Sequence, residues 1–105
     1  MEFNDLINKN TKLKKNFQKV KTKIKSKAIA GITNNSTNVK KNYLFVAIKG
    51  NIKNGNDYID SARKNGSSII ISSEKKGDDI VTIQDINMKE VYSLLCSAFY
   101  EKKPS

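Results

Sequence analysis

One apolar stretch limits most strongly what this chain can fold into. It reads Tyr-Leu-Phe-Val-Ala-Ile from Tyr43 to Ile48 and closes with Lys49 and Gly50. Branched and aromatic side chains in an unbroken apolar run favour a strand that is buried on both faces. Polar residues 33–37 precede the stretch, and an Asn/Lys/Gly loop, residues 51–55, follows it. The sequence therefore predicts a buried strand that leads into a loop suited to holding a ligand.

Three other segments have the composition of strands. Residues 68–72 contain three consecutive isoleucines between serines, and such a run is typical of a parallel sheet whose two faces are covered by helices. Residues 28–32 and 80–83 are shorter, apolar and β-branched, so we expect strands there as well. A turn at residues 40–42 then connects the first strand and its polar loop to the strand at 44–48.

Two segments after the central strand predict helices. Residues 57–66 have an apolar face, Asn56 or Asp57 as a candidate N-cap, and Gly66 where a left-handed residue ends a helix. Residues 88–100 have a second apolar face behind Asn87, a further candidate N-cap. The sequence thus predicts one small α/β domain with a mostly parallel sheet of about four to five strands flanked by helices, and a right-handed crossover before the strand at 68–72.

Length and composition exclude several classes of protein. A chain of 105 residues has room for one modest core. It has no histidine and one cysteine, Cys96, which excludes a disulfide framework and a cysteine-rich zinc site. We interpret Cys96, within an apolar helical pattern, as a core thiol in preference to a nucleophile. No apolar stretch approaches the length of a membrane span or a signal peptide, so we expect a cytoplasmic protein without a membrane partner.

The net charge of +10 raises the possibility of nucleic-acid binding. Of the 20 basic residues, however, only Arg63 is an arginine, and arginine is the preferred residue for contacts with bases and phosphates. The lysines are accompanied by many asparagines and isoleucines, a bias that an AT-rich genome would produce. We therefore consider nucleic acid an unlikely partner and expect a monomer.

Residues 1–27 form a basic N-terminal leader that we expect to be helical. Residues 2–10 predict a short helix around Phe3, Leu6 and Ile7. Residues 12–27 place Leu13, Phe17, Val20 and Ile24 in one stripe among lysines, which predicts a second, longer helix with its last residues already extended. Such a helix binds a membrane surface or a polyanion, or it packs its stripe on the domain; we favour packing.

Six features then appear in one order: Asn35-Ser36-Thr37, Val39, Leu44-Phe45-Val46-Ala47-Ile48-Lys49-Gly50, Asn54-Gly55-Asn56, Ile59 with Ala62, and Gly66-Ser67. In this order they resemble the N-terminal domain of the Mur ligases, the cytoplasmic ATP-dependent enzymes that build the peptidoglycan stem peptide. The likeness appears greatest to the UDP-N-acetylmuramoyl-tripeptide synthetases, whose first domain also ends in Phe-Tyr and Pro-Ser, as residues 99–105 do here. It covers about residues 29–105, and we assign residues 28–105 to this domain.

The resemblance implies a binding site for the UDP part of UDP-MurNAc-L-Ala-D-Glu. Ser36 would contact the diphosphate or ribose, with Asn34 and Asn35 beside it, and the loop of Asn51, Ile52 and Lys53 would lie against the uracil and ribose. Hydroxyl and backbone N–H groups at strand ends suit diphosphate oxygens, and a lysine adds attraction. The competing interpretation is that residues 34–38 only hydrogen-bond within their own turn.

The sequence departs from the family pattern at four positions, and these departures leave the substrate affinity open. Asn35 stands in place of the family's aspartate, Thr37 in place of its arginine, Asn54 in place of its second aspartate and Asn56 in place of its histidine. The family's phosphate-binding Gly-Thr-Asn-Gly-Lys-Thr segment, catalytic lysine and magnesium ligands are absent from the sequence. We therefore expect no catalytic or metal-binding residue here. The full-length enzyme would use ATP and Mg²⁺, bound by its ATP-binding and C-terminal domains.

Other functions fit parts of the same sequence. The sister ligase that adds D-Ala-D-Ala to the UDP-MurNAc-tripeptide shares much of this first-domain pattern. A small basic module for nucleic acids or anionic surfaces would use residues 12–27. A structural module with an empty pocket is a third alternative.

Overall fold

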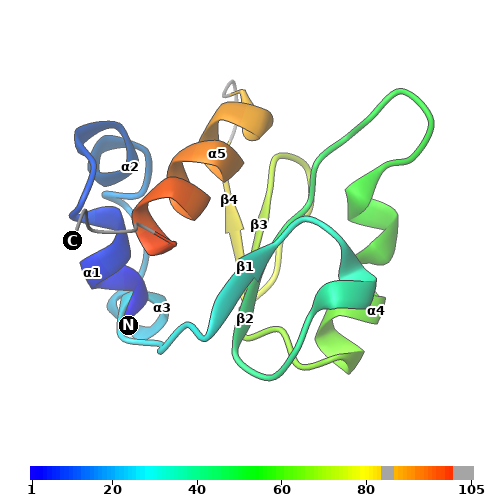
Figure 1. Cartoon of the computed structure of the whole chain (residues 1–105), viewed down its shortest axis with the longest axis horizontal. Coiled ribbons are helices and arrows are strands. Elements are labelled where there is room, and N and C mark those ends of the chain that lie inside the picture. Colours follow the sequence, from blue (N-terminus) through cyan, green and yellow to red (C-terminus); the bar gives the residue numbers. More distant parts are fainter. Residues whose placement is uncertain (84–86, 101–105) are drawn as a thin grey trace.

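The computed structural model describes residues 1–83 and 87–100, and its centre is one four-stranded sheet (Figure 1). Neighbouring strands are parallel and follow each other in chain order across the sheet. The predicted small α/β fold with a parallel sheet is confirmed. The strands are β1 (Gly31–Thr33), β2 (Tyr43–Val46), β3 (Ile69–Ser72) and β4 (Ile80–Thr82).

The sheet separates two apolar layers because successive side chains of a strand point to opposite faces. In β2, Leu44 and Val46 belong to one layer, whereas Phe45 belongs to the other. In β3, Ile69 and Ile71 lie on the first side and Ile70 on the second. Both strands therefore require an unbroken apolar sequence, which is why their runs were recognisable.

Helices cover both faces of the sheet (Figure 1). The larger layer packs against α5 (Met88–Phe99) and three short N-terminal helices, α1 (Phe3–Ile7), α2 (Thr11–Asn16) and α3 (Thr22–Lys25). The smaller layer packs against α4 (Ile59–Lys64), with two 3-10 turns nearby, η1 (Ser36–Asn38) and η2 (Gly55–Tyr58). The predicted N-cap of α5 is confirmed, since the Asn87 side chain accepts hydrogen bonds from the backbone N–H groups of Lys89 and Glu90. Among the described residues, no helix is long and apolar enough to cross a membrane.

The prediction of one helix over residues 12–27 is wrong, although its apolar stripe was recognised correctly. Leu13, Phe17 and Ile24 are buried in the larger layer, and Val20 is half-buried against it. The chain leaves helical geometry between α2 and α3. Helix α2 packs on α1 and α5, whereas α3 packs on α1. The bend between the two helices keeps both halves of the stripe in the buried layer.

The first strand starts later than predicted. Residues 28–32 were expected, but β1 covers Gly31–Thr33. The Ile29 N–H instead donates to the carbonyl of Met1 at 2.7 Å, and Ala28 forms an isolated antiparallel bridge with Glu2. The first half of the predicted strand therefore fixes the N-terminus, a long-range pairing that local sequence does not reveal.

The helix predicted for residues 57–66 also begins differently. Neither Asn56 nor Asp57 is its cap; the Asn54 side chain accepts from the Asn56 N–H at 3.0 Å and caps η2, and α4 starts after it at Ile59. The C-terminal prediction is confirmed, because Gly66 has φ of 115°. A Cβ there would lie 2.8 Å from the Cα of Lys41, so both the backbone conformation and the space require glycine.

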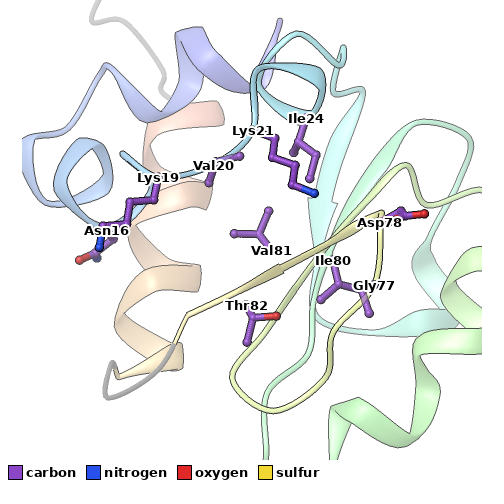
Figure 2. Close-up of a pocket in the computed structure, with 10 residues that line it drawn as sticks. All are labelled: Asn16, Lys19, Val20, Lys21, Ile24, Gly77, Asp78, Ile80, Val81 and Thr82. Atoms are coloured by element: carbon purple, nitrogen blue, oxygen red, sulfur yellow. The ribbon is translucent and has the colours of Figure 1, made fainter.

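Different groups lie beyond the two edge strands of the sheet, β1 and β4. Beyond β1, the Tyr100 hydroxyl accepts a hydrogen bond from the Ile32 N–H at 2.9 Å and donates to the Ile32 carbonyl at 3.3 Å. Beyond β4, the segment that joins α2 to α3 lies across a groove from the strand (Figure 2).

Candidate functional site

Two polar loops leave β1 and β2 at the carboxyl ends of these neighbouring parallel strands. A cavity of about 340 Å³ lies between the loops, at the edge of a parallel sheet where ligands commonly bind. Small-molecule sites in proteins enclose about 300–1,000 Å³, so the cavity is large enough for part of a nucleotide. It is lined by Asn34, Asn35, Ser36, Thr37, Phe45, Ile48, Lys53, Gly55 and Tyr58.

The structure brings four of the six predicted site residues together. Asn34, Asn35 and Ser36 line the cavity from the first loop, and Lys53 lines it from the second. Asn51 and Ile52 do not line it; the Ile52 side chain is 96% exposed. Lys53 of the predicted second loop lines the cavity, but the direction of each side chain in that loop depends on the loop's conformation.

Sequence reasoning missed the apolar wall of the cavity. Phe45 and Ile48 come from the central strand and its end, and Tyr58 comes from η2. Phe45 and Ile48 had been interpreted only as strand core. The sequence pattern puts Tyr58 on the apolar face of a helix, and only the structure, in which it is 38% exposed, shows that it lines the cavity.

The first loop is held in place by its own hydrogen bonds. The Thr33 hydroxyl accepts from the Asn35 N–H at 3.1 Å, and the Asn35 Oδ1 accepts from the Thr37 N–H at 3.0 Å and the Thr37 hydroxyl at 2.8 Å. The Asn65 amide donates to the Ser36 carbonyl at 2.8 Å and ties the loop to the end of α4. Asn35 therefore acts within its turn, as the competing interpretation predicted.

Ser36 differs from Asn35 in how its side chain is used. It is only 6% exposed and lines the cavity, yet no described residue hydrogen-bonds to its hydroxyl. A hydroxyl that is open to the cavity can hydrogen-bond a ligand there. Ser36 is therefore the first-loop residue best suited to contact a ligand.

The second loop returns close to its starting point. The Gly50 N–H donates to the Lys53 carbonyl at 2.8 Å, and the Gly55 N–H donates to the Ile48 carbonyl at 2.8 Å. A Cβ on Gly55 would lie 2.6 Å from the Ile48 backbone nitrogen, so only glycine permits this approach. The closed loop places Lys53 beside the cavity.

The second loop is anchored from behind by a buried polar network. The Asn56 side chain, 4% exposed, donates to the Asn54 Oδ1 at 2.8 Å and accepts from the Ser72 hydroxyl. The Ser72 oxygen in turn accepts from the backbone N–H groups of Glu74 and Lys75 at 3.1 and 2.9 Å. Two of the four departures from the family pattern, Asn54 and Asn56, thus bond to each other and to β3.

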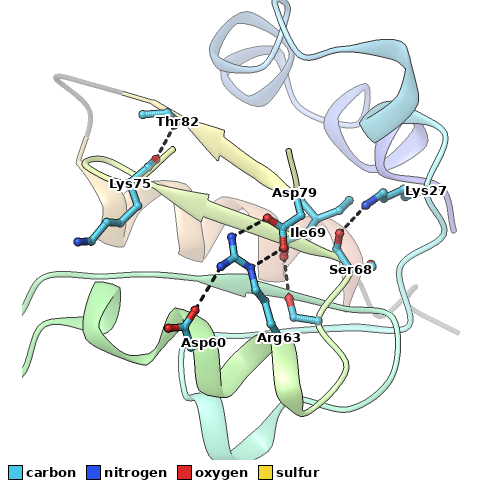
Figure 3. A network of polar contacts seen from close by, with 9 residues as sticks. Lys27, Asp60, Arg63, Ser68, Ile69, Lys75, Asp79 and Thr82 are labelled. Atoms are coloured by element: carbon cyan, nitrogen blue, oxygen red, sulfur yellow. Dashed lines mark hydrogen bonds and ion pairs between the residues drawn. The ribbon is translucent and has the colours of Figure 1, made fainter. Parts of the chain in front are cut away.

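The cavity favours an anion. Its lining residues include one lysine, Lys53, and no carboxylate. The one arginine of the chain is engaged elsewhere, as Figure 3 shows: the Arg63 Nε and Nη2 atoms each lie 2.8 Å from an Asp79 oxygen, and Nη1 lies 3.3 Å from Asp60. The Arg63 hydrogen bonds hold the pKa of Asp79 below its usual range. Arg63 therefore clamps α4 to the start of β4 and does not belong to the cavity.

Cys96 has the properties of a packed thiol. Burial raises the pKa of its thiol, and a hydrogen bond from Tyr92 only partly opposes this change. Burial also raises the pKa of the Tyr92 phenol to about 12. Both groups are neutral at pH 7, and a protonated thiol is a poor nucleophile, which agrees with the interpretation of Cys96 as part of the core.

Together, the fold and the cavity define a small α/β domain whose parallel sheet presents an anion-favouring pocket at the carboxyl ends of adjacent strands. Comparison with protein families identifies the family of this domain: residues 28–100 match the Mur ligase family, catalytic domain. The chain belongs to this family.

Solved structures of the same family have a similar fold. The MurF ligase of Thermotoga maritima, determined in complex with ADP, is 32% identical, covers 61% of this chain and has a TM-score of 0.54. Two structures from Acinetobacter baumannii are similar in fold at 17–18% identity, covering 59% and 67% of this chain. One is UDP-N-acetylmuramoylalanyl-D-glutamyl-2,6-diaminopimelate--D-alanyl-D-alanyl ligase, with a TM-score of 0.50, and the other is MurF, with a TM-score of 0.55.

The chain spans only 14–15% of the length of these three ligases. No curated protein sequence matches it.

Proposed function

We propose that this domain binds the UDP end of a UDP-N-acetylmuramoyl peptide in the cavity between the two loops. The observation that supports this proposal most is that Ser36 and Lys53, predicted from sequence as parts of one site, line one cavity. They come from different loops, 17 positions apart in the sequence, so local sequence alone does not require them to meet.

The lining offers partners for the diphosphate and the uracil of UDP. The Ser36 hydroxyl and the Asn34 amide supply hydrogen-bond donors to diphosphate oxygens, and hydrogen bonds to charged groups are stronger than neutral ones. The Lys53 ammonium adds attraction that is screened by solvent. Tyr58 and Ile48 offer apolar surface for the flat uracil ring.

The peptide that the substrate carries is the finer part of the proposal. UDP-MurNAc-L-Ala-D-Glu follows from the resemblance to the tripeptide synthetases, and part of that resemblance, residues 101–105, lies outside the described residues. The 32% identity to MurF of Thermotoga maritima favours the alternative, the ligase that adds D-Ala-D-Ala. Both substrates have the same UDP-MurNAc end, so the proposed contacts serve either enzyme.

We assign binding of the nucleotide end of the substrate to the described residues. They contain no group of three or more His, Cys, Asp or Glu side chains that could hold a metal ion. ATP and Mg²⁺ would supply activation of the acyl group in the full-length enzyme, on its ATP-binding and C-terminal domains. The proposed part of this domain is to hold and orient the nucleotide end of the substrate.

A titration followed by backbone amide chemical shifts tests the proposal. We expect UDP and UDP-MurNAc-L-Ala-D-Glu to shift the amides of residues 34–37 and 50–53. Ser36→Ala removes a hydrogen bond to a charged group, worth about 1.5–3 kcal/mol, so the Kd should rise roughly tenfold or more. Ser61→Ala, on the exposed side of α4, is the matched control and should leave the Kd unchanged.

Lys53→Gln provides a second test. It removes an exposed charge, so we expect the Kd to rise a fewfold at low salt and less at high salt. Lys64→Gln is its control, because Lys64 is equally exposed but lies on α4 outside the cavity. Absence of shifts with either uridine ligand, together with salt-sensitive shifts of residues 12–27 by a DNA duplex, would reject the proposal in favour of the basic-module alternative.

A further inference from the structure

The first loop of the candidate site fixes its own shape but not its own position. The hydrogen bonds among Thr33, Asn35 and Thr37 join residues that are close in sequence, and the Val39 N–H donates to the Ser36 carbonyl at 3.3 Å. Local bonds of this kind move with the loop as one unit. The place of the Ser36 hydroxyl at the cavity wall therefore depends on contacts with distant parts of the chain.

Polar contacts from distant residues reach the loop from both faces of the sheet, on which α4 and α5 lie (Figure 1). The Asn65 side-chain amide, at the end of α4, donates to the Ser36 carbonyl at 2.8 Å. From α5, on the opposite face, the Tyr92 phenol hydrogen-bonds the backbone of Asn34. The contact from Asn65 is made with the residue whose hydroxyl is open to the cavity, so it bears most directly on ligand binding.

The segment of residues 55–65 connects the two walls of the cavity. It begins directly behind the second loop, and Gly55 and Tyr58 of η2 line the cavity together with Lys53. It ends at Asn65, which bonds the first loop. One short stretch of chain thus carries part of one wall at its start and holds the other wall at its end.

Helix α4 makes this connection rigid. Ile59 and Ala62 are buried and pack with the central strand β2 in the smaller apolar layer. The end of the helix is closed by Gly66, whose N–H donates to the Arg63 carbonyl at 3.0 Å. Because both the helix and its end are fixed, the Asn65 amide keeps its place relative to the second loop.

We propose that Asn65 is a positioning residue for the diphosphate, because it holds the Ser36 hydroxyl where it and Lys53 reach the phosphates of one nucleotide. This inference rests on the proposed function. Asn65 does not line the cavity, so its influence on binding acts through Ser36. The apolar surface of Tyr58 and Ile48, proposed for the uracil, does not depend on the Asn65 bond. Asn65 therefore serves recognition of the phosphates and not of the uridine part.

The test compares UDP with uridine, each titrated into the whole chain and followed by backbone amide chemical shifts. Asn65→Ala removes the donor to the Ser36 carbonyl, so we expect the Kd for UDP to rise at least threefold and the Kd for uridine to stay the same. A substitution that only loosened the fold would weaken both ligands by the same factor. Asn8→Ala is the matched control and should change neither Kd, because Asn8 is the C-cap of α1 with a backbone conformation like that of Asn65 and lies outside the cavity lining.

A double-mutant cycle tests whether Asn65 acts through Ser36. In a Ser36→Ala background, Asn65→Ala should raise the Kd for UDP by a smaller factor than in the unaltered chain, since the hydroxyl that it positions is gone. The inference is overturned if Asn65→Ala raises the Kd for UDP less than threefold, if it weakens uridine equally, or if its factor is the same in both backgrounds. An unaltered chain that binds no UDP would overturn the proposed function together with this inference, whereas UDP binding that is indifferent to Asn65→Ala would overturn this inference alone.

Discussion

Replacement of Phe17 by alanine tests directly whether the basic leader is part of the domain. The Phe17 side chain is fully buried, and its ring packs edge-to-face on Phe3 with ring centroids 5.4 Å apart and planes at 74°. Both rings belong to the same apolar layer as Leu44 of the central strand. Loss of a buried phenylalanine typically costs about 3–5 kcal/mol, which includes the cavity that remains.

That cost is a large fraction of the stability of a small domain, about 5–15 kcal/mol. With an m-value of about 2 kcal/mol/M in urea, a loss of 4 kcal/mol lowers the unfolding midpoint by about 2 M. Urea unfolding followed by circular dichroism gives this number. Lys15→Ala, exposed on α2 two residues before Phe17, is the matched control and should change the free energy of unfolding by less than about 0.5 kcal/mol.

A leader that served only as a surface for polyanions would respond differently. Phe17→Ala would then cost no more than the Lys15→Ala control, and this result would refute the packing interpretation. If Phe17→Ala does not fold, Phe17→Leu keeps the test quantitative, with an expected loss of about 1–2 kcal/mol. A double-mutant cycle that combines Phe17→Ala with Phe3→Ala should give a coupling free energy of about 0.5–1.5 kcal/mol between the two rings.

Three further predictions concern the scaffold of the site. Because Arg63 lowers the pKa of Asp79, the pair stabilises the fold above the ordinary aspartate pKa of about 3.9. Asp79→Asn should therefore cost about 1 kcal/mol of unfolding free energy at pH 7. Urea unfolding at several pH values should show that this difference disappears as the pH falls below the pKa of Asp79 in the folded state. Gly66→Ala forces a positive φ on alanine and should lower stability by at least about 1–2 kcal/mol; an unchanged melting temperature would contradict the assigned conformation. Ser72→Ala leaves the buried Asn56 amide oxygen without its donor and should cost about 1–3 kcal/mol, whereas Ser93→Ala on the exposed side of α5 should cost almost nothing.

Some features of this protein follow from local sequence. Residues 43–46 of β2 and 69–71 of β3 are apolar because both faces of these strands are buried, so their patterns predicted a covered parallel sheet. Asn87 and Gly66 likewise predicted where helices begin and end, since a cap and a left-handed residue each have a specific chemical requirement. The Ser36 loop was recognised because a run of polar residues after a strand cannot be buried without partners.

Other features depend on contacts between distant parts of the chain. The stripe of the leader predicted which residues are buried, but it did not predict the bend between α2 and α3, which have different helical neighbours. Ala28 and Ile29 pair with the N-terminus in place of continuing β1, because Met1 and Glu2 reach them only in the folded state.

The candidate site also combines features that follow from local sequence with features that depend on tertiary contacts. Its loops, and Ser36 and Lys53 within them, were determined by the sequence, because the order of residues places polar groups at the ends of apolar strands. The tertiary structure decided that Ile52 points to solvent, that Tyr58 joins the cavity wall, and that Tyr100 bonds the outer edge of β1. Local sequence determines which segments are buried, whereas side-chain directions and sheet edges are set by packing between segments that are distant in the chain.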